Sequence, residues 1–180
     1  MDLVLALQNP KQRGKSYDTF KQSMKLLENI FHGKLEYVAD KEQWVYKKGN
    51  MRFSINTTAE GIKKLAILNT LLDNQFLSPG SVIFIDEPES ALHPTAISQL
   101  LDIVYILSEQ GMQFFMATHS YYVVKKMYLL AIQKKINIPI LVSDTKNHWY
   151  QQDLLNGLPE NEIINETIRL YDQELKASLQ

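Results

Sequence analysis

The sequence predicts an α/β fold: a largely parallel sheet with flanking helices, preceded by a small N-terminal antiparallel β patch. From residue 80 onward, short apolar runs alternate with helical patterns in the order strand, helix, strand, helix, strand. The runs 81–85 and 112–117 lack polar alternation, which is typical of strands buried on both faces of a parallel sheet. Residues 34–56 hold short aromatic segments separated by turn residues, which indicates an antiparallel meander.

The composition indicates one globular domain and bears on the partners and the compartment of the protein. With 180 residues, 45% of them apolar, the chain is large enough for one globular domain spanning 1–180. A net charge of −1 gives no sign of a nucleic-acid or anionic-membrane partner. The absence of cysteine excludes disulfides and thiolate metal sites and favours a reducing compartment. Because no run resembles a signal peptide or reaches transmembrane length, we expect a cytoplasmic protein without a membrane partner.

The first part of this domain, residues 1–56, is predicted to contain a helix and the β meander. Helical spacing of apolar residues predicts a helix over 17–31, which Ser16 could cap. The meander strands are expected at 34–40, 42–48 and 51–56.

Residues 57–180 are predicted to hold the larger sheet and its helices. A helix over 59–75 opens this part, with Thr57 or Thr58 as its cap, and Ser120 is expected to cap a later helix. The remaining elements are expected at 81–85 (strand), 94–110 (helix), 112–117 (strand), 121–132 (helix), 138–143 (strand), 148–154 (hairpin partner) and 160–176 (helix).

Two adjacent acids end the first buried strand. Ligands of open α/β sheets bind at the carboxyl ends of the strands, where Asp86 and Glu87 lie. Adjacent carboxylates at a buried strand end are costly unless a cation or hydrogen bonds compensate them. Asp86 suits a hard cation such as Mg²⁺, and Glu87 could orient or deprotonate a water molecule. The alternative is that both acids cap the following turn and stay solvated.

Four segments in a fixed order carry a family resemblance: "TTAEGIKKL" (57–65), "VIFIDE" (82–87), "SALHP" (90–94) and "THS" (118–120). They resemble the signature motif, Walker B strand, D-loop and His-switch of ABC-type ATPases. The nearest resemblance is to bacterial AAA family ATPases related to AbiEii-like toxins, OLD nucleases and SMC proteins. Gly61 lies 25 residues before Asp86 (86 − 61), and His119 lies 33 after it (119 − 86). The resemblance implies a partial P-loop NTPase fold of the ABC ATPase type.

The resemblance also implies site roles. Asp86 would hold Mg²⁺ through water, Glu87 would polarise the attacking water, and His119 would contact the γ-phosphate of ATP. Because the signature helix faces a nucleotide in the other subunit, a dimer is implied. The implied ATP-contacting residues are Thr58, Ala59, Glu60, Gly61 and Lys63 of the signature, and Ser90, Ala91, Leu92 and His93 of the D-loop.

Several of these residues also have ordinary structural interpretations. His119 could cap the helix that follows it, and His93 and Pro94 could simply begin a helix. The signature segment departs from the family, which usually has a serine followed by small residues where this chain has Ala59 and Glu60. It could therefore be an amphipathic helix without a ligand, unless Thr58 supplies the missing hydroxyl.

The sequence lacks a convincing phosphate loop. "NPKQRGKS" (9–16) is the one candidate, but it has Asn9 where a glycine is required and bulky residues inside the loop. We therefore expect the C-terminal half of an ABC-type domain, which would hydrolyse ATP only as a homodimer or with a chain that supplies the loop. Nucleic acid would be involved only indirectly. Strand 112–117 would then have an open edge, so we expect association through it, coverage by residues 1–8, or marginal stability.

Two other functions compete with this one. The first is a non-catalytic ATPase remnant that binds or regulates a partner protein. The second is a magnesium-dependent nuclease or toprim-like phosphotransferase that uses the acids. Such a site would need further acids at other strand ends, and Asp144 is the candidate.

Overall fold

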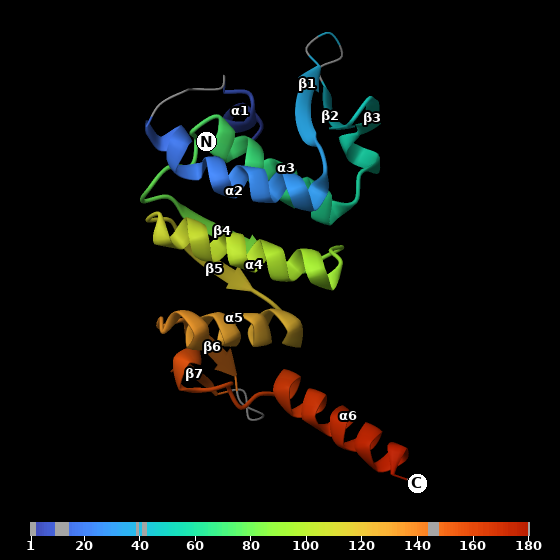
Figure 1. Cartoon of the computed structure of the whole chain (residues 1–180), viewed down its shortest axis with the longest axis vertical. Coiled ribbons are helices and arrows are strands. Elements are labelled where there is room, and N and C mark those ends of the chain that lie inside the picture. Colours follow the sequence, from blue (N-terminus) through green and yellow to red (C-terminus); the bar gives the residue numbers. More distant parts are fainter. Residues whose placement is uncertain (1–2, 10–14, 39, 41–42, 144–147, 180) are drawn as a thin grey trace. The chain divides into compact units, whose positions relative to one another are not determined.

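The computed structural model describes residues 3–9, 15–38, 40, 43–143 and 148–179 (Figure 1). The chain divides into two compact units, Met1–Ala117 and Thr118–Gln180. Each unit combines helices with strands, so the predicted α/β class is confirmed. The expectation that 1–180 forms one domain stays a prediction.

The first unit carries the meander and the parallel strands. Its elements are α1 (Leu3–Leu7), α2 (Lys15–Phe31), β1 (Lys34–Val38), β2 (Gln43–Lys48), β3 (Met51–Ser54), α3 (Glu60–Asp73), β4 (Val82–Asp86), α4 (Pro94–Glu109) and β5 (Gln113–Ala117). Strands β1, β2 and β3 form the antiparallel meander in sequence order, with Lys34 opposite Lys47 and Lys47 opposite Arg52. The N-terminal β patch is thus confirmed.

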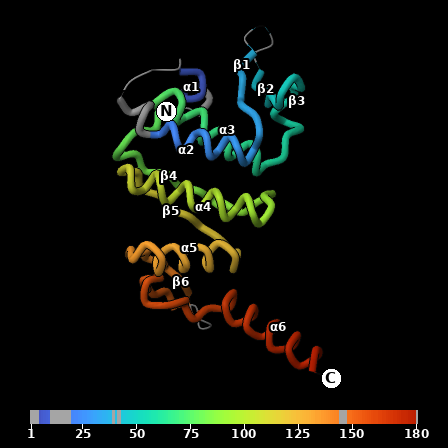
Figure 2. The backbone as a smooth tube through the Cα atoms, viewed as in Figure 1, coloured from blue at the N-terminus to red at the C-terminus, as the bar shows by residue number. Residues whose placement is uncertain are grey.

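The core of this unit lies among α2, α3, α4 and one face of the parallel strands. Figure 2 traces the backbone of these elements. Its fully buried side chains come from all three helices, including Phe20, Leu27, Leu65, Leu72 and Leu107. Ile83 of β4 and Phe114 and Met116 of β5 pack against this cluster. The helices therefore support the strands that carry the acid pair.

Strands β4 and β5 are parallel, with Asp86 opposite Ala117 at their carboxyl ends. Burial on these strands alternates, and Phe84 and Phe115 stack on the open face with ring centroids 5.0 Å apart. Phe84 is 76% exposed, so the expectation of burial on both faces is wrong. The physical reason is that the helical core of the first unit covers only one side of this strand pair.

Helix α1 shows that residues 3–7 are not a sheet segment. Ala6 and Leu7 are buried in the core, and the Asn74 side-chain amide donates to the Ala6 carbonyl at 2.7 Å. The expectation that residues 1–8 cover the edge of β5 is therefore wrong for the described part, because this segment docks as a helix on α3. Helix α2 begins at Lys15, so Ser16 lies inside it and is not its cap.

The second unit contains α5 (Tyr121–Lys134), β6 (Pro139–Ser143), β7 (Trp149–Asp153) and α6 (Glu162–Ser178). Strands β6 and β7 pair antiparallel, which confirms the predicted hairpin. Within the described residues of the second unit, β6 pairs with β7. The expectation that residues 138–143 extend the parallel sheet stays a prediction. Asn161 caps α6 by accepting from the Ile164 amide at 3.0 Å. Asp144 lies outside the described residues.

In the part of the chain that the structure describes, no helix combines the length and the apolar character needed to span a membrane.

Candidate functional site

The acid pair lies at the carboxyl end of β4, as predicted. Asp86 is the last residue of the strand, and Glu87 follows it with a left-handed backbone, φ 45°. The Glu87 amide donates to the Ala117 carbonyl of β5 at 2.9 Å, and the Ser90 amide donates to the Glu87 carbonyl at 3.0 Å. Both acids are exposed, so their carboxylates are accessible to a ligand.

Lys64 of α3 holds the backbone of both acids, a contact that sequence reasoning missed. Its ammonium group donates to the Asp86 carbonyl at 2.8 Å and to the Glu87 carbonyl at 2.9 Å. The signal that could have found it is helical phase. Lys64 lies three residues after Gly61, so the two residues share one face of α3, whereas Lys63 pairs with Glu60 at 3.2 Å.

The start of α3 differs from expectation. Ala59 is the capping residue and makes no side-chain bond, whereas the hydroxyls of Thr57 and Thr58 donate to the Ser54 carbonyl at 3.0 and 2.9 Å. The predicted threonine cap is therefore wrong, because a short 3₁₀ turn over Ile55–Thr57 directs both hydroxyls backward. The hydroxyl proton of Thr58 is therefore already used in the hydrogen bond to the Ser54 carbonyl.

Glu60 and Lys63 neutralise each other on the first turn of α3. The Lys63 ammonium group lies 3.2 Å from a carboxylate oxygen of Glu60, and the Glu60 side chain is 57% exposed. This pairing reduces the negative charge that Glu60 brings to the helix N-terminus. Glu60 stands where the family usually has a small residue.

Gly61 brings α3 into contact with the segment after the acids. A Cβ atom on buried Gly61 would lie 2.6 Å from Leu92 Cδ2 and 2.8 Å from the Ala91 carbonyl oxygen. Ala91 has a left-handed backbone, φ 56°, within the turn that carries Ser90. The structure thus brings the signature-like and D-loop-like segments together within one chain.

His93 begins α4. Its Nδ1 atom accepts from the Thr95 amide at 3.3 Å, and Pro94 occupies the first turn. The interpretation of His93 and Pro94 as a helix start is therefore confirmed. A D-loop role for His93 stays a prediction.

His119 follows β5 at the start of the second unit, and its side chain is exposed. Ser120 precedes α5 but makes no side-chain capping bond; its amide instead donates to the Thr118 hydroxyl at 3.0 Å. Ser120 is therefore the N-cap residue of α5, as predicted, but its side chain makes no capping bond. The phosphate role of His119 stays a prediction.

Two further features bear on ligand binding. Residues 10–14 of the candidate phosphate loop lie outside the described residues, so the interpretation of 9–16 as a phosphate loop stays a prediction.

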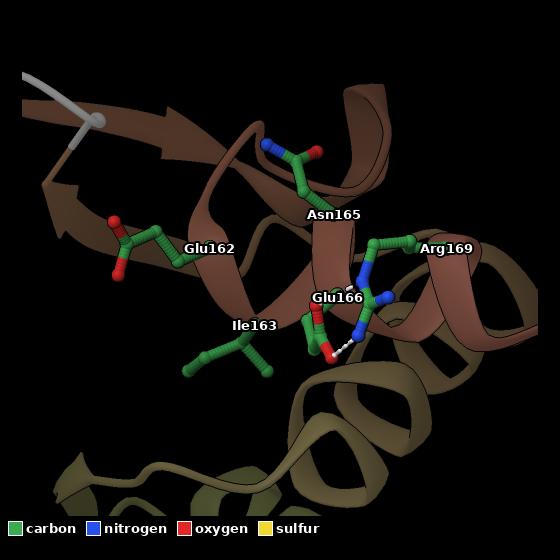
Figure 3. A pocket seen from close by; sticks show the side chains of 5 residues that line it. All are labelled: Glu162, Ile163, Asn165, Glu166 and Arg169. Atoms are coloured by element: carbon green, nitrogen blue, oxygen red, sulfur yellow. Dashed lines mark hydrogen bonds and ion pairs between the residues drawn. The ribbon is translucent and has the colours of Figure 1, made fainter.

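A shallow surface pocket on α6 is lined by Glu162, Ile163, Asn165, Glu166 and Arg169, with Glu166 and Arg169 forming an ion pair (Figure 3). None of the predicted site residues lines this pocket.

Comparison with known proteins identifies the family. The model of the family described as "AAA domain, putative AbiEii toxin, Type IV TA system" matches residues 18–125, more than half of the chain. A curated relative is the Old nuclease of Escherichia phage P2, which is 50% identical over 40 residues. That match covers 22% of this chain and only 7% of the nuclease.

Solved structures agree on the fold. One, from work on ATP-driven dimerization and DNA-stimulated activation of SMC ATPases, has a TM-score of 0.50 and 14% identity. It covers 85% of this chain and 97% of that one. Another, an SMC head bound to the C-winged helix domain of ScpA, has a TM-score of 0.51 and 15% identity, covering 77% of this chain and 44% of that one. The solved structures share the fold of this chain, and the family model shows that the chain belongs to the AAA domain family described as putative AbiEii toxin.

Proposed function

We propose that this chain is the hydrolytic half of an ABC/SMC-like ATPase site that acts on ATP with Mg²⁺. The observation that carries the proposal is the exposed Asp86–Glu87 pair at the carboxyl end of a parallel strand, held in place by α3. Ligands of open parallel sheets bind at such strand ends.

The residues at this strand end fit Mg²⁺. The described chain holds no group of three or more acidic, histidine or cysteine side chains that would form an all-protein metal cage. Mg²⁺ usually takes only one or two carboxylates beside phosphates and waters, which Asp86 can supply. When bound, Mg²⁺ and ATP would provide a polarised phosphoryl group. Asp86 would then hold Mg²⁺ through a water molecule. Glu87 would orient and deprotonate the attacking water, and His119 would contact the γ-phosphate of ATP.

The start of α3 is proposed to face the nucleotide of a second subunit. Helix N-termini attract phosphates because their first amides lack intrahelical partners. Two observations support this role: Ala59 caps α3 without a side-chain bond, and Lys63 balances the charge of Glu60. The proposed contacts are made by Thr58, Ala59, Glu60, Gly61 and Lys63, with Ser90, Ala91, Leu92 and His93 beside them. A homodimer would supply this arrangement.

The phosphate loop is proposed to come from another chain or segment. Support comes from the parallel strands, which form a two-stranded pair in the described first unit and expose Phe84 and Phe115. Exposed strand edges and apolar sheet faces are typical docking sites for further polypeptide.

The test measures ATP binding and ATP turnover by the chain, alone and mixed with a chain that carries a phosphate loop. We expect Glu87→Gln to lower turnover by about a hundredfold or more while ATP binding persists, because general-base catalysis contributes that much. The control Glu174→Gln removes an exposed carboxylate on α6 and should leave turnover unchanged. Equal turnover in the Glu87→Gln variant and the wild type would contradict the proposal.

A second variant, Lys15→Ala, tests the candidate loop at 9–16. Since we propose that the loop lies elsewhere, ATP binding should not change. Loss of binding on this substitution would instead identify 9–16 as a working phosphate loop.

A non-catalytic, partner-binding role is the second candidate, and the exposed Phe84–Phe115 pair favours it. It predicts a stable complex with a phosphate-loop chain but no ATP bound by this chain's residues. The same mixing experiment separates the two functions, because only the first predicts turnover sensitive to Glu87.

A further inference from the structure

We infer that Lys64 is the positioning residue of the acid pair, and this inference rests on the proposed function for its catalytic consequence. The ammonium group of Lys64 has three N–H donors, and two of them are directed at the carbonyls of Asp86 and Glu87. Lys64 thus joins α3 to the strand end through backbone atoms, leaving both carboxylates available.

Two features of the strand end show what this contact stabilises. The Glu87 amide donates to the Ala117 carbonyl of β5 at 2.9 Å, and the Glu87 carbonyl accepts from the Ser90 amide at 3.0 Å as well as from Lys64, so Lys64 reinforces the point where the strand passes into the following turn. Glu87 also has a left-handed backbone that disfavours any side chain with a Cβ atom. A cation that bonds both carbonyls stabilises this conformation and fixes the direction of the two side chains.

The neighbouring Lys63 provides a matched control. It lies on the same helical turn and pairs with Glu60 at 3.2 Å. Lys63→Met and Lys64→Met therefore remove the same charge from adjacent positions of α3. Only Lys64→Met removes bonds to the acid pair.

The first experiment does not depend on ATP turnover. Amide hydrogen exchange is measured in the full chain for the wild type and for Lys64→Met, Lys64→Arg and Lys63→Met. We expect Lys64→Met to accelerate exchange of the Glu87 amide about tenfold, since hydrogen bonds to charged groups stabilise more than neutral ones. Lys63→Met should match the wild type, and Lys64→Arg should recover most of the protection because guanidinium also donates to two acceptors. Equal exchange in both methionine variants would overturn the inference.

The second experiment uses the mixture that hydrolyses ATP. Lys64→Met should lower kcat about tenfold and leave KM within about twofold, because the acids are misdirected while nucleotide contacts persist. Lys64→Arg should recover part of kcat. An unchanged kcat despite faster Glu87 exchange would overturn the catalytic consequence. If the wild type does not turn over ATP, the proposed function fails, and the exchange result still decides whether Lys64 positions the acids.

Poor folding of Lys64→Met would be recognised by its thermal unfolding. In that case Lys64→Gln, which keeps one amide donor group, replaces it in the exchange measurement. An intermediate rate for Lys64→Gln, between those of the wild type and a fully exposed amide, supports the inference. A wild-type rate contradicts it.

Discussion

Glu36 of β1 is the carboxylate with the most cationic surroundings in the described meander. Lys34, Lys47 and Arg52 place their charged groups 2.8, 3.5 and 3.6 Å from it. The hydrogen bond from Lys34 holds the pKa of Glu36 below its ordinary value of 4.5, despite partial burial. Since Lys34, Lys47 and Arg52 lie directly opposite one another across the strands, Glu36 also relieves a row of like charges.

This geometry predicts a pH dependence. Because the pKa of Glu36 is lower in the folded chain, its stabilisation is present above pH 4.5 and is lost as the pH falls through the folded pKa. Glu36→Gln should lower the free energy of unfolding by less than about 1 kcal/mol at pH 7, with the difference vanishing in acid. Chemical unfolding of both chains from pH 7 to pH 3 measures this. A difference that grows toward low pH would contradict it.

At the residue scale, the sequence predicted the acids but not their support. The acids were predictable because an apolar run that ends in two carboxylates is visible in the chain itself. The contact from Lys64 was not, because it depends on the rotation of α3 over a strand 22 residues away. A threonine cap of α3 would accept a bond from a backbone amide, whereas the hydroxyls of Thr57 and Thr58 donate to the Ser54 carbonyl. Both arrangements are compatible with the same sequence pattern.

Helix α3 is the element that organises the site, because it contacts the acids through Lys64 and the following turn through Gly61. Gly61→Ala tests the second contact. Alanine favours helix by about 1 kcal/mol, but its Cβ atom would crowd Leu92 and the backbone oxygen of Ala91. Overpacking costs about 1–3 kcal/mol, so we expect net destabilisation.

Thermal and chemical unfolding measure this effect, with the double variant Gly61→Ala/Leu92→Ala as the control. Removing the Leu92 side chain should relieve part of the crowding, so the two substitutions should be less than additive. Strict additivity would show that Gly61 and Leu92 do not interact.

At the element scale, the helices and strands from α2 onward were predictable to within a few residues. Helix α1 was not predicted, and neither was the exposure of one face of β4 and β5. Their uninterrupted apolar pattern indicates burial on both faces, and the structure of the first unit leaves Phe84 and Phe115 exposed. The apolar pattern of a strand shows which of its residues can be buried. It does not show whether the described part of the chain provides a second layer of helices to cover them.

At the scale of the whole molecule, the open strand pair predicts self-association. Because Phe84 is 76% exposed and stacks on exposed Phe115, we expect the mass of the chain in solution to rise with concentration. Phe84→Ser should weaken this association, whereas Phe53→Ser, which alters an exposed ring on β3, should not. Light scattering over a concentration series measures it. A monodisperse monomer with a high melting temperature would contradict this prediction.

The left-handed backbone of Glu87 lowers the stability of the fold, whereas the proposed reaction requires the carboxylate of this residue. Glycine adopts that conformation without steric cost, and asparagine adopts it more readily than glutamate. Selection for thermal stability alone would therefore favour Glu87→Gly or Glu87→Asn, and either substitution would discard the carboxylate. Under the proposed function, the glutamate at position 87 marks a site that gives up stability, of the order of 1 kcal/mol, in return for its reactive group.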